Sequence, residues 1–101
     1  MIVVKKDGVN LIIIPQGDMV SQESTGFLSD VKNLDMKPVE NLVVDFSQVS
    51  MIDSMGLGAL IAIHKILKEG SKVLKVKSIQ PDVYKLMVAM GLDRHFSITG
   101  I

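Results

Sequence analysis

Two adjacent polar residues, Asp53 and Ser54, stand directly before a long apolar-rich segment that ends at Gly70. Either residue is a favoured helix N-cap, and the unpaired backbone N–H groups of a helix N-terminus attract negative charge. Ser54 therefore has two interpretations: a plain cap, or a phosphorylation site whose phosphate the helix N-terminus would hold. Asp53 has two as well, because it can cap the helix or orient Ser54 toward a kinase. A phosphate would add about −1.5 to −2 charges at neutral pH.

Two glycines, Gly56 and Gly58, fall in the first turns of the same predicted helix. A glycine in a helix interior costs about 1 kcal/mol relative to alanine, so two of them require a reason. One reason is the close approach of another backbone, a partner or a ligand. The other is tight packing of the helix on its own sheet, and the sequence leaves both open.

Other kinds of chemistry find little support. His64 and His95 have no second ligand at a metal-binding spacing, and the chain has no cysteine. Ser54 lacks the Gly-x-Ser-x-Gly pattern of a hydrolase nucleophile, since Ile52 occupies the first glycine position. Gly56-x-Gly58 is too short for a dinucleotide or phosphate-loop fingerprint. We therefore expect no enzymatic activity, no metal and no cofactor.

The bulk composition favours a small cytoplasmic binding domain. The chain has 101 residues, of which 48% are hydrophobic and only 4% aromatic, so we expect one domain with an aliphatic core. Eleven basic and eleven acidic residues balance to zero net charge, which argues against direct binding of nucleic acid. We expect no secretory leader and no membrane insertion, because no run approaches the ~20 apolar residues that cross a bilayer.

Strands and helices alternate along the chain after an initial hairpin. Asp7-Gly8 predicts a tight turn with positive φ at both central positions, and the unbroken apolar run Leu11–Ile14 predicts a strand covered on both faces. Ser21 or Ser24 is expected to cap the first helix, and Pro81 and Gly91 to bracket the third. The alternation predicts an α/β fold. The expected strands are 2–6, 9–14, 42–46, 73–77 and 96–99, and the expected helices run to about Leu34, from Ser54 to about Glu69, and from Pro81 to about Met90.

The helix after Ser54 has two contrasting arcs at 100° per residue. The arc expected to pack on the sheet contains Met55, Ala59, Leu60, Ala62, Ile63, Ile66 and Leu67. The opposite arc is polar except for Leu57 and Ile61, which lie within two turns of Ser54. These two residues can form a protein contact beside Ser54, or Leu57 can tuck under the 47–52 loop while Ile61 is a scattered exposed residue.

The run Val43–Gly58 resembles the signature of STAS domains, and in particular that of bacterial anti-sigma factor antagonists. The resemblance implies a small mixed β-sheet with helices packed mainly on one face. It also implies that Ser54 is phosphorylated by an anti-sigma factor that is itself a serine kinase of the ATP-binding, histidine-kinase-like fold. The unphosphorylated form would bind that factor and release a sigma factor, phosphorylation would block binding, and a metal-dependent serine phosphatase would reset the switch.

The expected contact surface comprises the Asp18 loop, the Ser50–Ser54 loop and the outer face of the helix. Its predicted partner-binding residues are Asp18, Asp53, Ser54, Met55, Gly56, Leu57, Gly58 and Ile61. Two positions depart from the family pattern: Val20 stands where the first loop usually has Asp, and Met55 replaces a small residue. The family's usual C-terminal helix is also not expected. The alternative is a STAS module that is never phosphorylated and serves as a subunit or scaffold of a transport or signalling complex.

Overall fold

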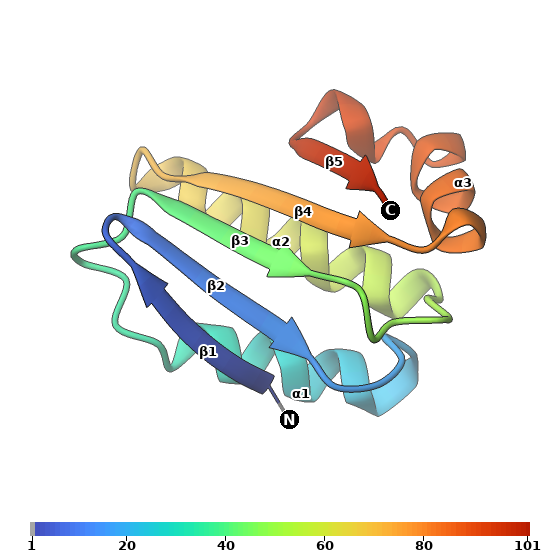
Figure 1. Ribbon diagram of the computed structural model, residues 1–101, viewed down its shortest axis with the longest axis horizontal. Helices are drawn as coiled ribbons and strands as arrows, with labels where there is room; N and C mark the ends of the chain where they lie inside the picture. Colours follow the sequence, from blue (N-terminus) through green and yellow to red (C-terminus); the bar gives the residue numbers. More distant parts are fainter. Residues whose placement is uncertain (1) are drawn as a thin grey trace.

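The fold is a five-stranded mixed sheet with three helices, and the computed structural model describes residues 2–101. The strands lie in the order β1-β2-β3-β4-β5; only β1 and β2 pair antiparallel, and the other neighbours are parallel. The predicted α/β class with a mixed sheet is thereby confirmed (Figure 1). The bounds are β1 Ile2–Asp7, β2 Asn10–Pro15, α1 Ser21–Lys32, β3 Asn41–Asp45, α2 Ser54–Glu69, β4 Val73–Ile79, α3 Pro81–Ala89, the 3₁₀ turn η1 Leu92–Arg94, and β5 Ser97–Gly100.

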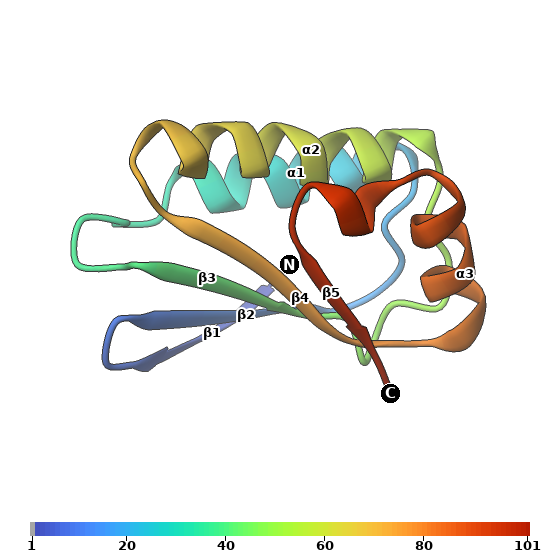
Figure 2. The ribbon, with the colours of Figure 1, turned by 90° about the horizontal axis from the view of Figure 1, so that it is seen from above.

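The helices lie mainly on one side of the sheet, as predicted. Figure 2 shows α1 and α2 side by side over one face of the sheet. The short helix α3 follows the carboxyl end of β4 and lies at that end of the molecule. The expectation that Leu11–Ile14 is covered on both faces is wrong. Leu11 and Ile13 are buried under the helices, whereas Ile12 and Ile14 are half-buried on the opposite face, which no helix of the described chain covers.

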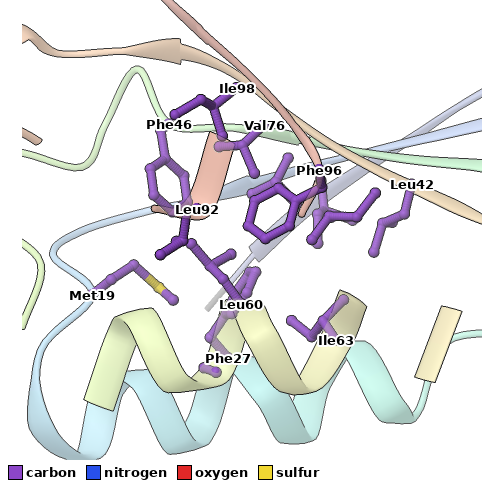
Figure 3. Close-up of a cluster of buried hydrophobic side chains, with 14 of the residues drawn as sticks. Met19, Phe27, Leu42, Phe46, Leu60, Ile63, Val76, Leu92, Phe96 and Ile98 are labelled. Carbon is purple, nitrogen blue, oxygen red and sulfur yellow. The ribbon is translucent and has the colours of Figure 1, made fainter. Parts of the chain in front are cut away.

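The core between the sheet and the helices is mostly aliphatic, as the composition predicts. Its side chains come from every layer, and Figure 3 shows the three phenylalanines, Phe27, Phe46 and Phe96, among them. Met19, from the loop between β2 and α1, points into the same core near the start of α2. The buried Met19 side chain therefore anchors the loop that carries Asp18 to the core.

Several local predictions need correction. The central residues of the hairpin turn are Gly8 and Val9, and only Gly8 has positive φ. α3 begins at Pro81 and is followed by Gly91 at φ 78°, as predicted. Its helical period predicts an inner stripe of Val83, Leu86, Met87 and Met90, of which only Val83 and Met87 are buried, whereas Leu86 and Met90 are exposed. The helix is too short and too near the edge of the sheet to cover a full stripe.

Candidate functional site

Two loops come together at the amino-terminal end of α2. The Met19 N–H donates to the Met51 carbonyl oxygen at 3.0 Å, and the Asp53 N–H donates to the Met19 carbonyl oxygen at 3.2 Å. These bonds form an isolated parallel bridge between Met19 and Ile52, outside the main sheet. We call this region the tip and define it as residues 16–20 and 47–53 together with the first turn of α2, residues 54–57. The tip unites the two loops from which the contact surface was predicted.

Asp18 fastens the first loop to the second. One of its carboxylate oxygens accepts hydrogen bonds from the Ser50 N–H at 2.9 Å, the Ser50 hydroxyl at 2.8 Å and the Met51 N–H at 3.1 Å. The Ser50 hydroxyl and then the Ser50 backbone N–H hold the pKa of Asp18 below its ordinary value, because they stabilise the charged form. Asp18 is thus an anionic clasp inside the tip, with part of its surface exposed.

Asp53 caps two helices at once. Its Oδ1 accepts from the N–H groups of Met55 and Gly56, both at 3.0 Å, which confirms it as the N-cap of α2. Its Oδ2 accepts from the Ser21 N–H at 2.9 Å, at the start of α1. The Ser21 bond, followed by the Gly56 bond, lowers the pKa of Asp53.

This bridge corrects the predicted cap of α1. The N-cap residue is Val20, which has no side-chain oxygen, and neither Ser21 nor Ser24 caps the helix with its hydroxyl. The carboxylate of Asp53 supplies the missing acceptor from the other loop. Val20, where the family pattern has Asp, lacks a side-chain acceptor for the start of α1. The carboxylate of Asp53 therefore compensates for this missing acceptor.

Ser54 is the first residue of α2 and is exposed at the tip. The N–H groups of Met55 and Gly56 bind the Asp53 carboxylate, and the Leu57 N–H donates to the Asp53 carbonyl oxygen at 3.0 Å. These three donors are therefore already engaged in the unphosphorylated chain, and the expectation that the helix N-terminus would hold a phosphate on Ser54 stays a prediction.

The two glycines have different roles. A Cβ on Gly56 would lie 2.3 Å from the Met19 carbonyl oxygen and 2.6 Å from Cγ1 of Ile52, so Gly56 allows α2 to pack on the bridged loops. Gly58 is exposed, and a Cβ there would meet nothing within 4 Å. Tight packing thus explains Gly56, whereas Gly58 leaves the helix backbone exposed, with no side chain over it.

The predicted arcs of α2 are partly reversed at the tip. Leu57 is only 7% exposed and belongs to the core, which contradicts its prediction as a partner-contact residue and agrees with the alternative that it is tucked inward. Met55, expected to face the sheet, is 50% exposed. Ile61 is half-buried against the core, and Ile66, expected inside, is exposed. The exposed apolar residue next to Ser54 is therefore Met55.

Met55 borders a shallow groove between α1 and α2 beside Ser54. The groove has a volume of about 200 Å³, and its walls are Ser24, Thr25, Leu28, Met55, Gly58 and Ala59. The Ser24 hydroxyl is buried there and has no hydrogen-bond partner among the described residues. Such a group favours a ligand or partner atom that can bond to it, since an unpaired buried hydroxyl is costly. The sequence offered Ser24 only as a helix cap.

A pair of histidines outside the tip was also not predicted. His64 on α2 and His95 after η1, treated as isolated residues in the sequence, have ring centroids 6.1 Å apart. Within residues 2–101 no group of three or more His, Cys, Asp or Glu side chains is placed to hold a metal ion. None of the described helices is both long and apolar enough to cross a membrane.

Known structures share this fold. A Thermotoga maritima protein, a candidate anti-sigma factor antagonist, matches with a TM-score of 0.89 and 21% identity, over 99% of this chain and 86% of that one. The anti-sigma factor antagonist SpoIIAA in its unphosphorylated form matches with a TM-score of 0.80 and 15% identity, over 97% and 87% of the two chains. Murine Slc26a9, an anion transporter, matches with a TM-score of 0.74 and 20% identity, over 96% of this chain but only 17% of the transporter.

The family follows from the sequence match rather than from these distant likenesses, which by themselves show only the fold. The STAS domain model matches residues 1–100, nearly the whole chain. The signature from Val43 to Gly58 covers the end of β3, the second loop of the tip and the start of α2. The chain belongs to the STAS domain family.

Proposed function

We propose that this protein is an anti-sigma factor antagonist that acts as a phosphorylation-controlled binding switch. In this proposal the unphosphorylated tip binds an anti-sigma factor, itself a serine kinase, and thereby frees a sigma factor. Phosphorylation of Ser54 blocks the contact, and a serine phosphatase restores it. The protein itself catalyses no reaction and works in the cytoplasm. Structural similarity to SpoIIAA supports the general role.

The observation that carries the proposal is the state of Ser54. Its side chain is exposed, while the backbone donors of the following residues already bind Asp53. A kinase can therefore reach the hydroxyl without unfolding the helix. The added phosphate has none of these three donors to neutralise it, so its charge is displayed on the surface.

The displayed charge is sufficient to prevent docking. A partner packed on Met55 and the bare Gly58 would have to bury a dianion next to the Asp53 carboxylate. Burying an uncompensated charge costs several kcal/mol, and each 1.4 kcal/mol changes an affinity tenfold. The switch therefore needs no large movement of the fold, since the helix dipole still favours negative charge at this end.

The test is phosphorylation by the cognate anti-sigma kinase with ATP. We expect one phosphopeptide, containing Ser54, and none from Ser54→Ala. Ser54→Asp should remain folded by circular dichroism but bind the kinase at least about tenfold more weakly, whereas Ser29→Asp, on the exposed side of α1 away from the tip, serves as the matched charge control. Phosphorylation at another residue, or equal loss in both Asp variants, would contradict the proposal.

A second candidate is a STAS module that is never phosphorylated and joins a transport or signalling complex. The likeness to the Slc26a9 transporter supports it, because the same fold occurs there within a much longer chain. The same tip would then bind its partner constitutively. A stable complex from native cells in which Ser54 is never modified, and whose affinity is unchanged in Ser54→Asp, would favour this candidate over the switch.

A further inference from the structure

A pocket rich in cationic side chains lies beyond the tip, where the later turns of α2 approach η1 and the start of β4. Its volume is about 290 Å³, and its polar lining consists of His64, Lys68, Lys72, Arg94 and His95. We call it the basic pocket. His64 and Lys68 are four residues apart, so they project from the same face of α2. Arg94 and His95 come from η1 and the residue after it.

The rings in the basic pocket are held by the core. The Phe96 ring lies 5.5 Å from the His64 ring and is itself largely buried, where it contacts the aliphatic core shown in Figure 3. The His95 ring centroid lies 6.1 Å from that of His64, and His95 is exposed. The His64 imidazole thus lies against the buried Phe96 at one wall of the pocket, and His95, Lys68 and Arg94 are its exposed lining residues.

Positive charge dominates the lining of the basic pocket. Lys72 is engaged, because its ammonium donates to the Val39 carbonyl oxygen. Among residues 2–101 no acidic residue lines the pocket, and the neighbouring Glu69 and Asp93 are exposed outside it, as is Lys65. Burial is the main cause that lowers the pKa of His64, and the nearby charges of Lys68, His95 and Lys65 lower it further because they repel a second positive charge. In a chain of zero net charge, this local excess of cations favours an anion.

We propose that the basic pocket binds the phosphate group of a small soluble ligand. Arg94 can donate two parallel N–H bonds to phosphate oxygens, Lys68 supplies a mobile charge, and the imidazoles of His64 and His95 offer further N–H donors. The volume lies near the lower end of the range for small-molecule sites, about 300–1,000 Å³, and suits a phosphate or pyrophosphate group.

This binding is separate from the switch at Ser54. His64 is ten residues beyond Ser54 on α2, which places it about 15 Å further along the helix axis. None of the basic-pocket residues belongs to the tip. The inference therefore stands or falls without the proposed function.

The experiment is a proton NMR titration of the intact chain with inorganic phosphate and pyrophosphate. His64 and His95 are the only two histidines, so their ring signals report directly on the basic pocket and His95→Gln assigns them. We expect saturable shifts of both signals, a rise in the pKa of the His64 imidazole, and tighter binding of pyrophosphate. Sodium chloride at matched ionic strength is the control. Shifts that are unsaturable and equal to those in chloride would overturn the proposal.

Variants separate direct binding from general electrostatics. The double variant Lys68→Gln/Arg94→Gln changes two exposed residues and should keep the fold by circular dichroism. We expect it to bind pyrophosphate at least about tenfold more weakly. Lys65→Gln removes a charge from the same helix but outside the pocket and should change the affinity by no more than about twofold. Equal weakening by Lys65→Gln, or no weakening by the double variant, would reject a site at the basic pocket.

Discussion

The two ends of α2 handle charge in opposite ways. At the tip the charges are the carboxylates of Asp18 and Asp53, and both accept three hydrogen bonds from the protein itself. At the basic pocket the charged side chains are cationic. Within residues 2–101, Lys72 is the one cationic side chain of this pocket that donates a hydrogen bond.

This difference shows that one small domain can have both a rigid surface and an adaptable one. The carboxylates of the tip form hydrogen bonds that join two loops and two helices, so the shape of the tip is set before any partner binds. The basic pocket leaves its cations free to respond to an added anion. The following variants test whether the tip is as tightly built, and the basic pocket as electrostatically open, as this comparison requires.

The largest expected effect concerns the packing under the tip. Leu57→Ala should lower the free energy of unfolding by about 2–5 kcal/mol, because it removes a buried core side chain. Met55→Ala, two residues earlier but half-exposed, should change it by no more than about 0.5 kcal/mol. Urea unfolding of both variants measures the difference. A surface role for Leu57, as the helical periodicity suggested, would make the two losses equal and small.

Alanine substitutions at the two glycines should have smaller effects on stability, and the two effects should differ in sign. Gly56→Ala forces a methyl group against the Met19 carbonyl oxygen and should destabilise the fold by about 1–3 kcal/mol. Gly58→Ala has open space and a helical backbone, and should stabilise it by about 0.4–1 kcal/mol. Thermal unfolding of the two variants side by side checks the signs. If Gly56→Ala were neutral, the tip would not be a tightly packed unit.

The clasping carboxylates predict a loss of stability in acid. The pKa values of Asp18 and Asp53 are lowered from 3.8 in the fold, so these groups stabilise it above that value, and the contribution is lost as the pH falls through the lowered values. Asp18→Asn/Asp53→Asn should melt at a lower temperature than wild type at neutral pH. The gap should close as the pH falls below 3.8, measured by melting curves across pH. A gap that is independent of pH would mean that charge is not what fastens the loops.

The sequence predicted those parts of the fold that depend on local signals. The bounds of α2 and its cap at Asp53 both follow from neighbouring residues. The reversal of Met55 and Leu57 does not, because periodicity gives the width of an apolar arc but not how the helix is rolled. The contact of Gly56 with Met19 fixes that roll.

The parts of the sites that the sequence did not predict are long-range contacts. Asp53 reaches Ser21 across 32 residues, and His64 meets His95 across 31. Neither pair has a spacing that indicates contact, since the tertiary fold alone brings the loops and η1 to α2. The signal that could have suggested the first was the absence of any side-chain oxygen at Val20, which leaves the start of α1 in need of an acceptor.

The smallest expected effect concerns the titration of His64 in the basic pocket. Lys68→Gln removes one of the neighbouring charges that lower its pKa, so the pKa of His64 should rise toward 6.5 without reaching it, because burial remains the larger cause. Because the folded pKa lies below the unfolded one, protonation of His64 opposes folding: its contribution is intact above pH 6.5 and declines as the pH falls through that value to the folded pKa.

Lys68→Gln should therefore reduce this decline, and proton NMR titration of His64 with melting curves on both sides of pH 6.5 measures both quantities. Lys85→Gln, on an exposed position of α3 away from the basic pocket, is the control. If both variants left the pKa of His64 unchanged, the cations of the basic pocket would be too well screened to act on one another. An anion would then gain little from them, and the contrast between the two ends of α2 would reduce to the tip alone.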